Sequence, residues 1–170
     1  GVMLRYDGTA WSPASSGTAL MLRAVWGSAA NDVFVAGNVG TILHFDGGSW
    51  TSMTTGTSAD LNALWGTSAT DVFAAGADGT LLHFDGSAWS AMNSGTSQYL
   101  FALWGAGAND VFTAGMHGTT LHYDGSVWAP IASGANGPLG PFVGGWARWE
   151  SDVFAVGGDG EAWRFDGSVW

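Results

Sequence analysis

The chain has 170 residues and no cysteine or lysine, and its 14 acidic side chains against 4 arginines give a formal charge of −10. Without cysteine, disulfides, thiolate metal sites and thiol nucleophiles are excluded, and the negative charge disfavours nucleic acids and anionic membrane surfaces as partners. No apolar run approaches the roughly 18 residues that would mark a membrane span, and the start at Gly1 predicts a processed or truncated N-terminus.

One pattern recurs five times along the chain, each time ending on a tryptophan that follows an Asp-Gly pair. Successive closing tryptophans are 39 residues apart except the last, which follows after 42: Trp11, Trp50, Trp89, Trp128 and Trp170. A second signature, Asp-Val-Phe, has the same spacing and starts at Asp32, Asp71, Asp110 and Asp152. The extra residues fall in the Gly/Pro-rich stretch 133–142, where an insertion costs little.

In chain order, residues 1–16 form half a unit, 17–56, 57–95 and 96–134 form complete units, and 135–170 form a nearly complete one. Each complete unit holds four short apolar runs, here named strands A to D, which in 57–95 read LNALWG, DVFAAG, TLLHF and AWSAM. The Asp-Gly pair between C and D predicts a two-residue type I′ turn with positive φ at both residues. The stretch GADGT predicts a similarly tight B to C turn.

Four antiparallel strands per repeat are typical of a β-propeller blade, so we expect one all-β domain with a 39-residue repeat. The ring does not close, because residues 1–16 supply only strands C and D while 135–170 supply A, B, C and the start of D. Either this is a segment of a longer propeller of six to eight blades, or two copies associate to finish one ring. The end at Trp170, within a strand, favours the first alternative.

The unit WGTSATDVFAAGADGTLLHFDGSAW, residues 65–89, resembles repeats of bacterial secreted and surface β-propellers. Its hairpin is more distantly similar to the Asp-box or BNR-type repeat of sialidases and of photosystem assembly-factor propellers, although Asp85 to Trp89 is four residues instead of five. The resemblance implies the fold. It implies no sialidase activity, because the four scattered arginines offer no counterpart to the catalytic arginine cluster of those enzymes.

The repeated polar residues are expected to be structural. Three histidines share one position, which the outer units fill with Arg5 and Arg164: His44, His83 and His122. Since arginine donates hydrogen bonds but does not ligate metals, each ring is expected to bond a turn or a neighbouring blade. Turn roles are predicted for Asp46, Asp85 and Asp124, bonds from turn amides for the aspartates that precede strand B, and packing for Trp50, Trp89 and Trp128. No metal or cofactor is expected.

Function is expected where the units differ, because the fold already explains the repeated positions. These candidate partner- or sugar-binding residues are Tyr99, Met116, His117, Arg148, Trp149 and Glu150. An exposed Trp149 beside charged neighbours could stack on a sugar or anchor a protein, and the alternative is that it covers the insertion loop. Replacing Trp149 by Ala is predicted to abolish partner binding without lowering the melting temperature.

These observations predict a non-enzymatic interaction and scaffold module with a protein partner, since no Ser-His-Asp order or paired carboxylates stand apart from the repeat. The alternative is a lectin that binds a glycan on its loop aromatics. A weaker alternative is an assembly factor or accessory subunit docking on a membrane complex. The abundance of Gly, Ser, Thr and Trp, the acidity and the absence of lysine favour a bacterial extracellular, surface or periplasmic location.

Overall fold

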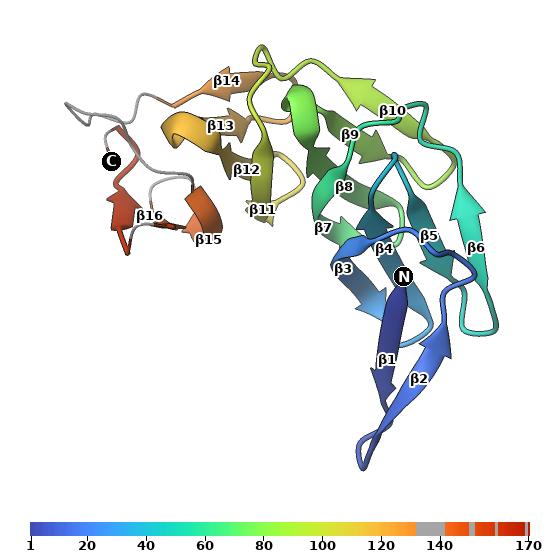
Figure 1. Ribbon diagram of the computed structural model, residues 1–170. Coiled ribbons are helices and arrows are strands. Elements are labelled where there is room, and N and C mark those ends of the chain that lie inside the picture. Colours follow the sequence, from blue (N-terminus) through green and yellow to red (C-terminus); the bar gives the residue numbers. More distant parts are fainter. Residues whose placement is uncertain (132–141, 150–151, 159, 169) are drawn as a thin grey trace.

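The computed structural model describes residues 1–131, 142–149, 152–158, 160–168 and 170 (Figure 1). Strands make up almost all of its regular structure, and two short segments, η1 (Ala77–Gly79) and η2 (Met116–Gly118), are each closed by one hydrogen bond from the N–H of the next residue to the carbonyl of the first. None of the described helices is long and apolar enough to cross a membrane. The strands are β1 (Val2–Tyr6), β2 (Trp11–Ser15), β3 (Leu22–Ala29), β4 (Asp32–Gly37), β5 (Ile42–Phe45), β6 (Trp50–Met53), β7 (Leu61–Ser68), β8 (Asp71–Gly76), β9 (Leu81–Phe84), β10 (Trp89–Met92), β11 (Leu100–Gly107), β12 (Asp110–Gly115), β13 (Thr120–Tyr123), β14 (Trp128–Pro130), β15 (Phe142–Trp149), β16 (Asp152–Gly157) and β17 (Ala162–Phe165).

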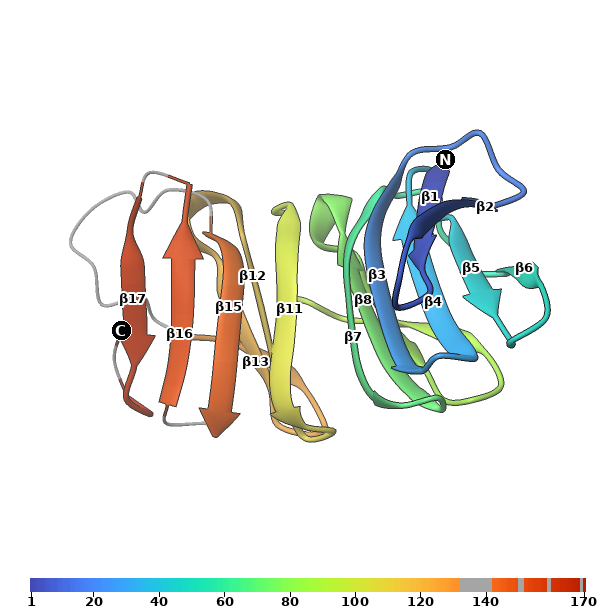
Figure 2. The ribbon, with the colours of Figure 1, turned by 90° about the horizontal axis from the view of Figure 1, so that it is seen from below.

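The strands form five separate antiparallel sheets in chain order. Three are complete, β3 to β6, β7 to β10 and β11 to β14; the first holds only β1 and β2, and the last holds β15 to β17 among the described residues. In Figure 1 the sheets follow one another around an open arc, and the two end sheets do not meet. Figure 2 shows the A strands β3, β7, β11 and β15 side by side along the arc. The fold is therefore all-β, as expected, and the described sheets form an incomplete ring.

The predicted strands A to D of the unit 57–95 correspond to β7, β8, β9 and β10. Neighbouring strands are joined by short turns and pair in antiparallel register, for example Phe73 with His83 and Trp89 with Phe84. Strand B is buried almost throughout, because sheets on both sides cover it. An apolar run without alternation is the pattern that such a strand requires.

The core lies between successive sheets rather than within one. Phe34 of β4 is fully buried, and its ring lies 5.7 Å from Phe84 and 6.3 Å from Trp89 of the next sheet. Trp89 also donates its indole N–H to the sulfur of Met53 in the preceding sheet, at 3.4 Å. Phe73 repeats this arrangement one sheet further on. Each sheet therefore depends on its neighbour for burial, which is why the unit is repeated.

The predicted type I′ turn between strands C and D is wrong. Phe84 pairs with Trp89, so the loop holds four residues, and the Asp85 carboxylate accepts hydrogen bonds from the backbone N–H groups of Ser87 and Ala88 at 2.8 and 2.9 Å. Of the Asp-Gly pair, only Gly86 has positive φ. An aspartate side chain that caps its own loop replaces the main-chain geometry of a two-residue turn.

The type I′ geometry instead occurs between strands B and C. Asp78 and Gly79 have φ of 55° and 68°, and the N–H of Thr80 donates to the carbonyl of Ala77 at 2.9 Å. The same turn recurs in the neighbouring complete sheets, with positive φ at Val39 and His117. Both central residues are left-handed in every case, as this turn requires.

Candidate functional site

The connections divide the molecule into two faces. We call one the turn face; it carries the B to C turns (38–41, 77–80 and 116–119) and the D to A connections (16–21, 54–60 and 93–99). The opposite face carries the A to B and C to D turns. The predicted site residues split between them, with Tyr99, Met116 and His117 on the turn face and Arg148 at the other end of its strand. They therefore do not form one site.

Tyr99, Met116 and His117 do lie together. The backbone N–H of Met116 donates to the carbonyl of Tyr99 at 2.8 Å, and the His117 ring is hydrogen-bonded through Nδ1 to Oε1 of Gln98 at 2.8 Å. Gly115 permits this contact, because a Cβ there would lie 1.9 Å from the Tyr99 carbonyl oxygen. Close backbone approach thus positions the three candidate side chains.

Arg148 is an exposed residue of β15 near the A to B turn, on the opposite face. The side chain of Trp149 and all of Glu150 lie outside the described residues. The expectation that Trp149 binds a partner or sugar therefore stays a prediction.

Exposed large apolar side chains fall into three groups. One lies on the N-terminal hairpin β1 to β2, one on the C-terminal sheet β15 to β17, and the third on the turn face; among the residues that the structure describes, only Val25 and Val127 lie elsewhere. The turn-face group consists of Leu20, Met21, Val39, Tyr99 and Met116. The first two groups are blade faces without a neighbour, whereas the third lies on turns and connections. Only the turn-face group is therefore unexplained by the stacking of sheets.

The turn face is asymmetric along the arc. Its apolar side chains come from the sheets β3 to β6 and β11 to β14, and the sheet between them presents Asp60 and Asp78 at the equivalent positions. Asp60 is paired with Arg23 at 3.1 Å and accepts the backbone N–H of Val39 at 3.0 Å, so it ties two sheets together. Asp78 is exposed. The face thus has an acidic centre between two apolar groups.

Main-chain bonds hold the turns of this face in place. Gly79 donates to the carbonyl of Gln98 at 2.9 Å, and Gly40 donates to that of Ala59 at 2.8 Å, so each turn is joined to the connection that leads into the next sheet. These bonds involve no side chain. Except at Asp60, whose carboxylate also accepts the N–H of Val39, the side chains at these positions can therefore differ while the backbone stays the same.

Acidic loop residues on the opposite face have a structural explanation. Hydrogen bonds from the side chain and backbone of Ser87 and from the backbone of Ala88 lower the pKa of Asp85 to about 2. The pKa of Asp124 is likewise lowered to about 2, chiefly by the backbone N–H of Val127. Equivalent bonds lower the pKa of Asp46. These carboxylates serve their own loops, in keeping with the predicted turn roles.

The repeated histidines were expected to bond a turn or a neighbouring blade. Each of them instead bonds an aspartate of strand B in its own blade. Nε2 of His44 lies 2.6 Å from Oδ1 of Asp32, the first residue of strand B in the same sheet. The corresponding distances are 2.7 Å for His83 and 2.8 Å for His122. Each ring also packs on the buried phenylalanine of strand B, at 4.4 to 4.5 Å between centroids.

The aspartates before strand B therefore accept from side chains instead of turn amides. Arg164 takes the place of histidine in the last sheet, with Nε 2.8 Å from Asp152. Ser28 and Thr67 donate to the same aspartates as His44 and His83, which places the carboxylate between hydroxyl and imidazole. In a catalytic triad the histidine is in the middle, so this order does not activate the hydroxyl. Among the residues that the structure describes, no three His, Asp or Glu side chains converge.

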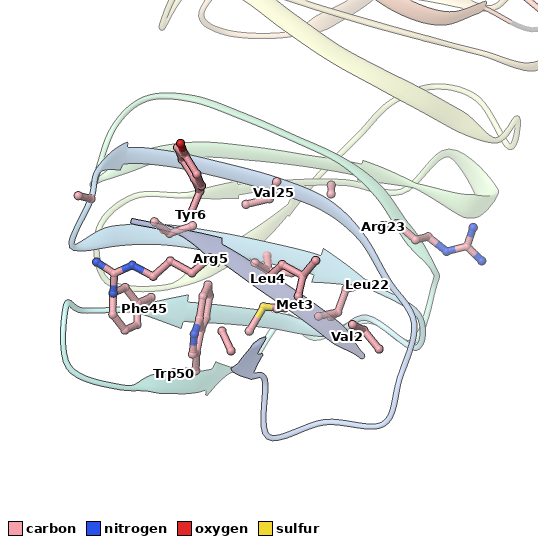
Figure 3. A pocket seen from close by; sticks show the side chains of 15 residues that line it. Val2, Met3, Leu4, Arg5, Tyr6, Leu22, Arg23, Val25, Phe45 and Trp50 are labelled. Atoms are coloured by element: carbon pink, nitrogen blue, oxygen red, sulfur yellow. The ribbon is translucent and has the colours of Figure 1, made fainter. Parts of the chain in front are cut away.

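A cavity of about 640 Å³ lies between the N-terminal hairpin and the first complete sheet. Figure 3 shows Arg5 and Met3 of β1 on one side and Phe45 and Trp50 on the other. In the complete blades the buried phenylalanine of strand B occupies the corresponding place, as Phe34 does against Phe84 and Trp89. Among the described residues the first sheet holds only β1 and β2, which correspond to strands C and D, so no strand-B phenylalanine fills this space.

No protein-family model matches the chain, and no curated protein matches it. Among solved structures it is similar to YCF48 from Cyanidioschyzon merolae, with a TM-score of 0.64 and 14% identity over 85% of this chain and 53% of that one. A structure of YCF48 bound to D1 peptide gives a TM-score of 0.65 and 14% identity, covering 95% of this chain and 60% of that chain. The fold is a β-propeller.

A third propeller-like match is a protein of unknown function from Bacteroides thetaiotaomicron VPI-5482, with a TM-score of 0.60 and 14% identity over 85% of this chain and 43% of that chain. At such identity the likeness shows the fold alone. The chain spans between half and two thirds of the length of the YCF48 structures.

Comparing the repeats with one another in the sequence did not identify every residue of the turn-face group. Met21 occupies the same repeat position as Tyr99, and Val39 occupies the same position as His117. Comparison of these equivalent positions, once the turns were assigned, would have found both. The signal lay in the apolar character of residues that precede strand A or fill the left-handed turn position.

Proposed function

We propose that the chain is a non-enzymatic interaction module that binds a protein partner on its turn face. The observation that carries this proposal is the group of exposed apolar side chains on turns whose backbone is already fixed by main-chain bonds. Tyr99 and Met116 are 43% and 38% exposed, and sheet stacking gives neither of them a role. Preorganised aromatic and methionine side chains are favoured in protein interfaces.

The asymmetry of the face suggests the chemistry of the partner. Two apolar groups flank Asp78, whose carboxylate is exposed and free of turn hydrogen bonds. A complementary segment would place apolar side chains against Tyr99 and Met116 and a basic residue opposite Asp78. With a chain charge of −10, basic partners are also favoured at long range.

One further finding supports a peptide as ligand, namely that a propeller of similar fold was solved bound to D1 peptide. The same finding favours a role in assembly, by docking on a membrane complex, as the second candidate function. A glycan partner is the competing proposal from the aromatic loops. We place the module outside the cytoplasm on the composition of the chain.

The test is a screen of the chain against an array of linear 15-residue peptides and, in parallel, a glycan array. The decisive variant replaces Tyr99 and Met116 together by serine. The control is Val127→Ser, which removes an apolar side chain that is 59% exposed from the opposite face. Peptide hits should bind wild type and control alike and bind the double variant about 30-fold more weakly, the scale of an interface hot spot of about 2 kcal/mol.

Thermal melts of all three proteins complete the test. Since Tyr99 and Met116 are exposed, the melting temperature of the double variant should match that of the control. Peptide hits retained by the double variant would move the site away from the turn face. Glycan hits displaced by free sugar, with no peptide hits, would make the protein a lectin.

A further inference from the structure

The outermost strand of each complete sheet has one free edge. β6, β10 and β14 lie on the outside of the arc (Figure 1), and each of them pairs with a single strand among the described residues. A free edge is a template for another strand, and proteins commonly block it with proline, charge or a bulge. The residues along each edge therefore decide whether it accepts a further strand.

The hydrogen bonds of β14 show which of its residues face outward. The N–H of Ile131 donates to the carbonyl of Thr120 at 3.0 Å, so Ile131 bonds inward, to the side of β13. Because bonded and non-bonded pairs alternate in an antiparallel ladder, the adjacent Pro130 turns its backbone groups outward. Proline has no N–H to offer a further strand, so the edge of β14 is blocked.

Proline occupies this position in two of the four strands D that the structure describes. It is Pro13 in β2 and Pro130 in β14, whereas β6 has Ser52 and β10 has Ala91, each opposite a leucine of strand C. The shared register gives Ser52 and Ala91 the same outward backbone, and both residues carry an N–H. The edges of β6 and β10 are therefore open.

The open edge of β10 adjoins a groove of about 430 Å³ between its own sheet and the next one. The end of β10 forms one wall, and the C to D loop before β14 forms the other. Its lining combines polar and apolar side chains, among them Ser90, Met92, Asn93, Ser126, Val127 and Trp128. The indole N–H of Trp128 donates to the sulfur of Met92 at 3.3 Å and so joins the two walls. Since Ser90 and Met92 both line the groove, a strand added to β10 would place every second side chain in it.

The charge beside this groove indicates the chemistry of the partner. Asp85 and Asp124 lie in the C to D loops that lead into β10 and β14, and both are exposed. Hydrogen bonds within these loops lower the pKa of each carboxyl to about 2, so both are charged at neutral pH. A second copy of this chain, with its charge of −10, would be repelled, whereas a basic segment would be attracted.

We propose that β10 binds an extended segment of another protein by strand addition, with a basic residue of that segment beside Asp85 and Asp124. Backbone pairing with the outward groups of Ala91 supplies affinity, and the groove selects the side chains. Because the lining is partly polar and partly apolar, it suits an amphipathic side chain such as tyrosine. This site, here called the rim site, uses none of the turn-face residues.

The first test closes the edge with a residue that the fold already accepts there. Ala91→Pro gives β10 the proline of β14 and should melt as wild type does. Ser52→Pro closes the equivalent edge of β6 and is the matched control, because the smaller Ala88 replaces Val127 beside that strand. The probe is the fluorescein-labelled peptide Lys-Thr-Tyr-Thr-Tyr-Thr-Tyr-Thr-Lys, read by fluorescence anisotropy. Ala91→Pro should bind it at least about 10-fold more weakly than wild type, and Ser52→Pro should bind it as wild type does.

The second test leaves the protein unchanged and does not depend on a variant folding. One isomer of the probe is N-methylated at its tyrosines and the other at its threonines. Since alternate residues of a strand bond to the same neighbour, one isomer should lose binding and the other should keep it. Exchanging both lysines of the probe for glutamates should abolish binding, because Asp85 and Asp124 then face like charges.

Two further variants separate the rim site from the turn face. Val127→Ser removes part of the groove wall and should weaken binding of the probe about five-fold, whereas replacing Tyr99 and Met116 by serine should leave it unchanged. A wild-type chain that does not bind the probe overturns the proposal, and so do two N-methylated isomers that bind alike. Equal binding by Ala91→Pro and Ser52→Pro has the same meaning. Light scattering that gives twice the chain mass of 17.5 kDa for wild type and the single mass for Ala91→Pro would make a second copy the occupant instead.

Discussion

Val39 holds a backbone conformation that valine disfavours. Its φ is 57°, it is the first central residue of a type I′ turn, and its side chain is 57% exposed, so little burial compensates. For a β-branched residue the left-handed region costs roughly 1–2 kcal/mol. Asn-Gly is the pair that this turn prefers.

We therefore expect Val39→Asn to stabilise the protein by about 1 kcal/mol. Urea unfolding at pH 7 measures the change. Asp78→Asn at the equivalent position serves as the control and should have little effect, because aspartate already tolerates this conformation. An unchanged or lower stability of Val39→Asn would mean that its side chain contributes to packing.

The loop carboxylates make the free energy of unfolding depend on pH in the acidic range. The folded-state pKa of Asp85 and Asp124 is about 2, whereas an aspartate in an unfolded chain has a pKa of about 3.9. A lowered folded pKa stabilises the native state above pH 4, and this contribution is lost as the pH falls towards 2. Asp7 behaves in the same way.

Unfolding between pH 4 and pH 2 should thus be accompanied by proton uptake. In Asp85→Asn the slope of unfolding free energy against pH should fall by up to about one proton in this window, while the amide oxygen keeps accepting the loop N–H groups. Asp78→Asn, whose carboxylate makes no such bonds, is the control. An identical slope in Asp85→Asn and wild type would contradict the assignment.

At the scale of the strand pair, each sheet with described strands B and C joins them through one polar contact beside the phenylalanine of strand B. In the three complete sheets this contact is His to Asp, and in the last it is Arg164 to Asp152. Histidine and arginine both supply an N–H donor to the carboxylate. Because histidine and arginine both occur at this position of strand C, we expect each to be able to replace the other.

His83→Arg should leave the stability within about 1 kcal/mol of wild type, whereas His83→Leu should lower it by about 1–3 kcal/mol, because the partly buried Asp71 keeps Thr67 but loses its imidazole donor. Chemical denaturation of both variants compares them directly. Equal stability of the leucine variant and wild type would show that apolar packing on Phe73 fully compensates for the lost hydrogen bond.

Phenylalanines at the same repeat position differ in burial, because some lie between two sheets and others lie at the end of the arc. Phe73 is 1% exposed between two sheets, whereas Phe154 at the end of the arc is 41% exposed. Phe73→Ala should cost about 3–5 kcal/mol, and Phe154→Ala well under half of that in the isolated chain. Denaturation at low protein concentration provides the comparison. Equal costs would indicate that the end face is covered.

At the scale of the whole molecule, charge is the main unfavourable term that solution conditions can change. With a net charge of −10, the carboxylates repel one another at neutral pH. Raising the NaCl concentration from about 10 mM to about 500 mM screens this repulsion and should raise the melting temperature. KCl should have the same effect. A fall in melting temperature would mean that the His-Asp and Arg-Asp pairs outweigh the repulsion.

The repeat made the strands predictable, because 39-residue spacing and short apolar runs leave few alternatives. Turn type was not predictable from a dipeptide. Asp78-Gly79 forms the type I′ turn and Asp85-Gly86 does not, although both read Asp-Gly. The difference is that the Asp85 side chain accepts N–H groups from its own loop, which depends on the length set by the pairing of Phe84 with Trp89.

Two of the five residues of the turn-face group followed from the sequence, namely Tyr99 and Met116, because they depart from the repeat. Leu20, Met21 and Val39 did not, since an apolar residue in an apolar chain gives no local signal of exposure. The aspartates that bond the histidines could not be predicted from the sequence either. His83 and Asp71 are 12 residues apart, and only the register of β8 with β9 brings them together.

The main-chain bonds of the B to C turns have an evolutionary consequence. They hold the backbone of residues 39, 78 and 117, and of Met21 and Tyr99 before β3 and β11, without using the side chains of these residues. Mutations at these positions can therefore change what is recognised while leaving folding intact. Duplication of a 39-residue unit adds another pair of such positions to a working scaffold. Recognition in this molecule can thus diversify one blade at a time, in nature or in a designed library.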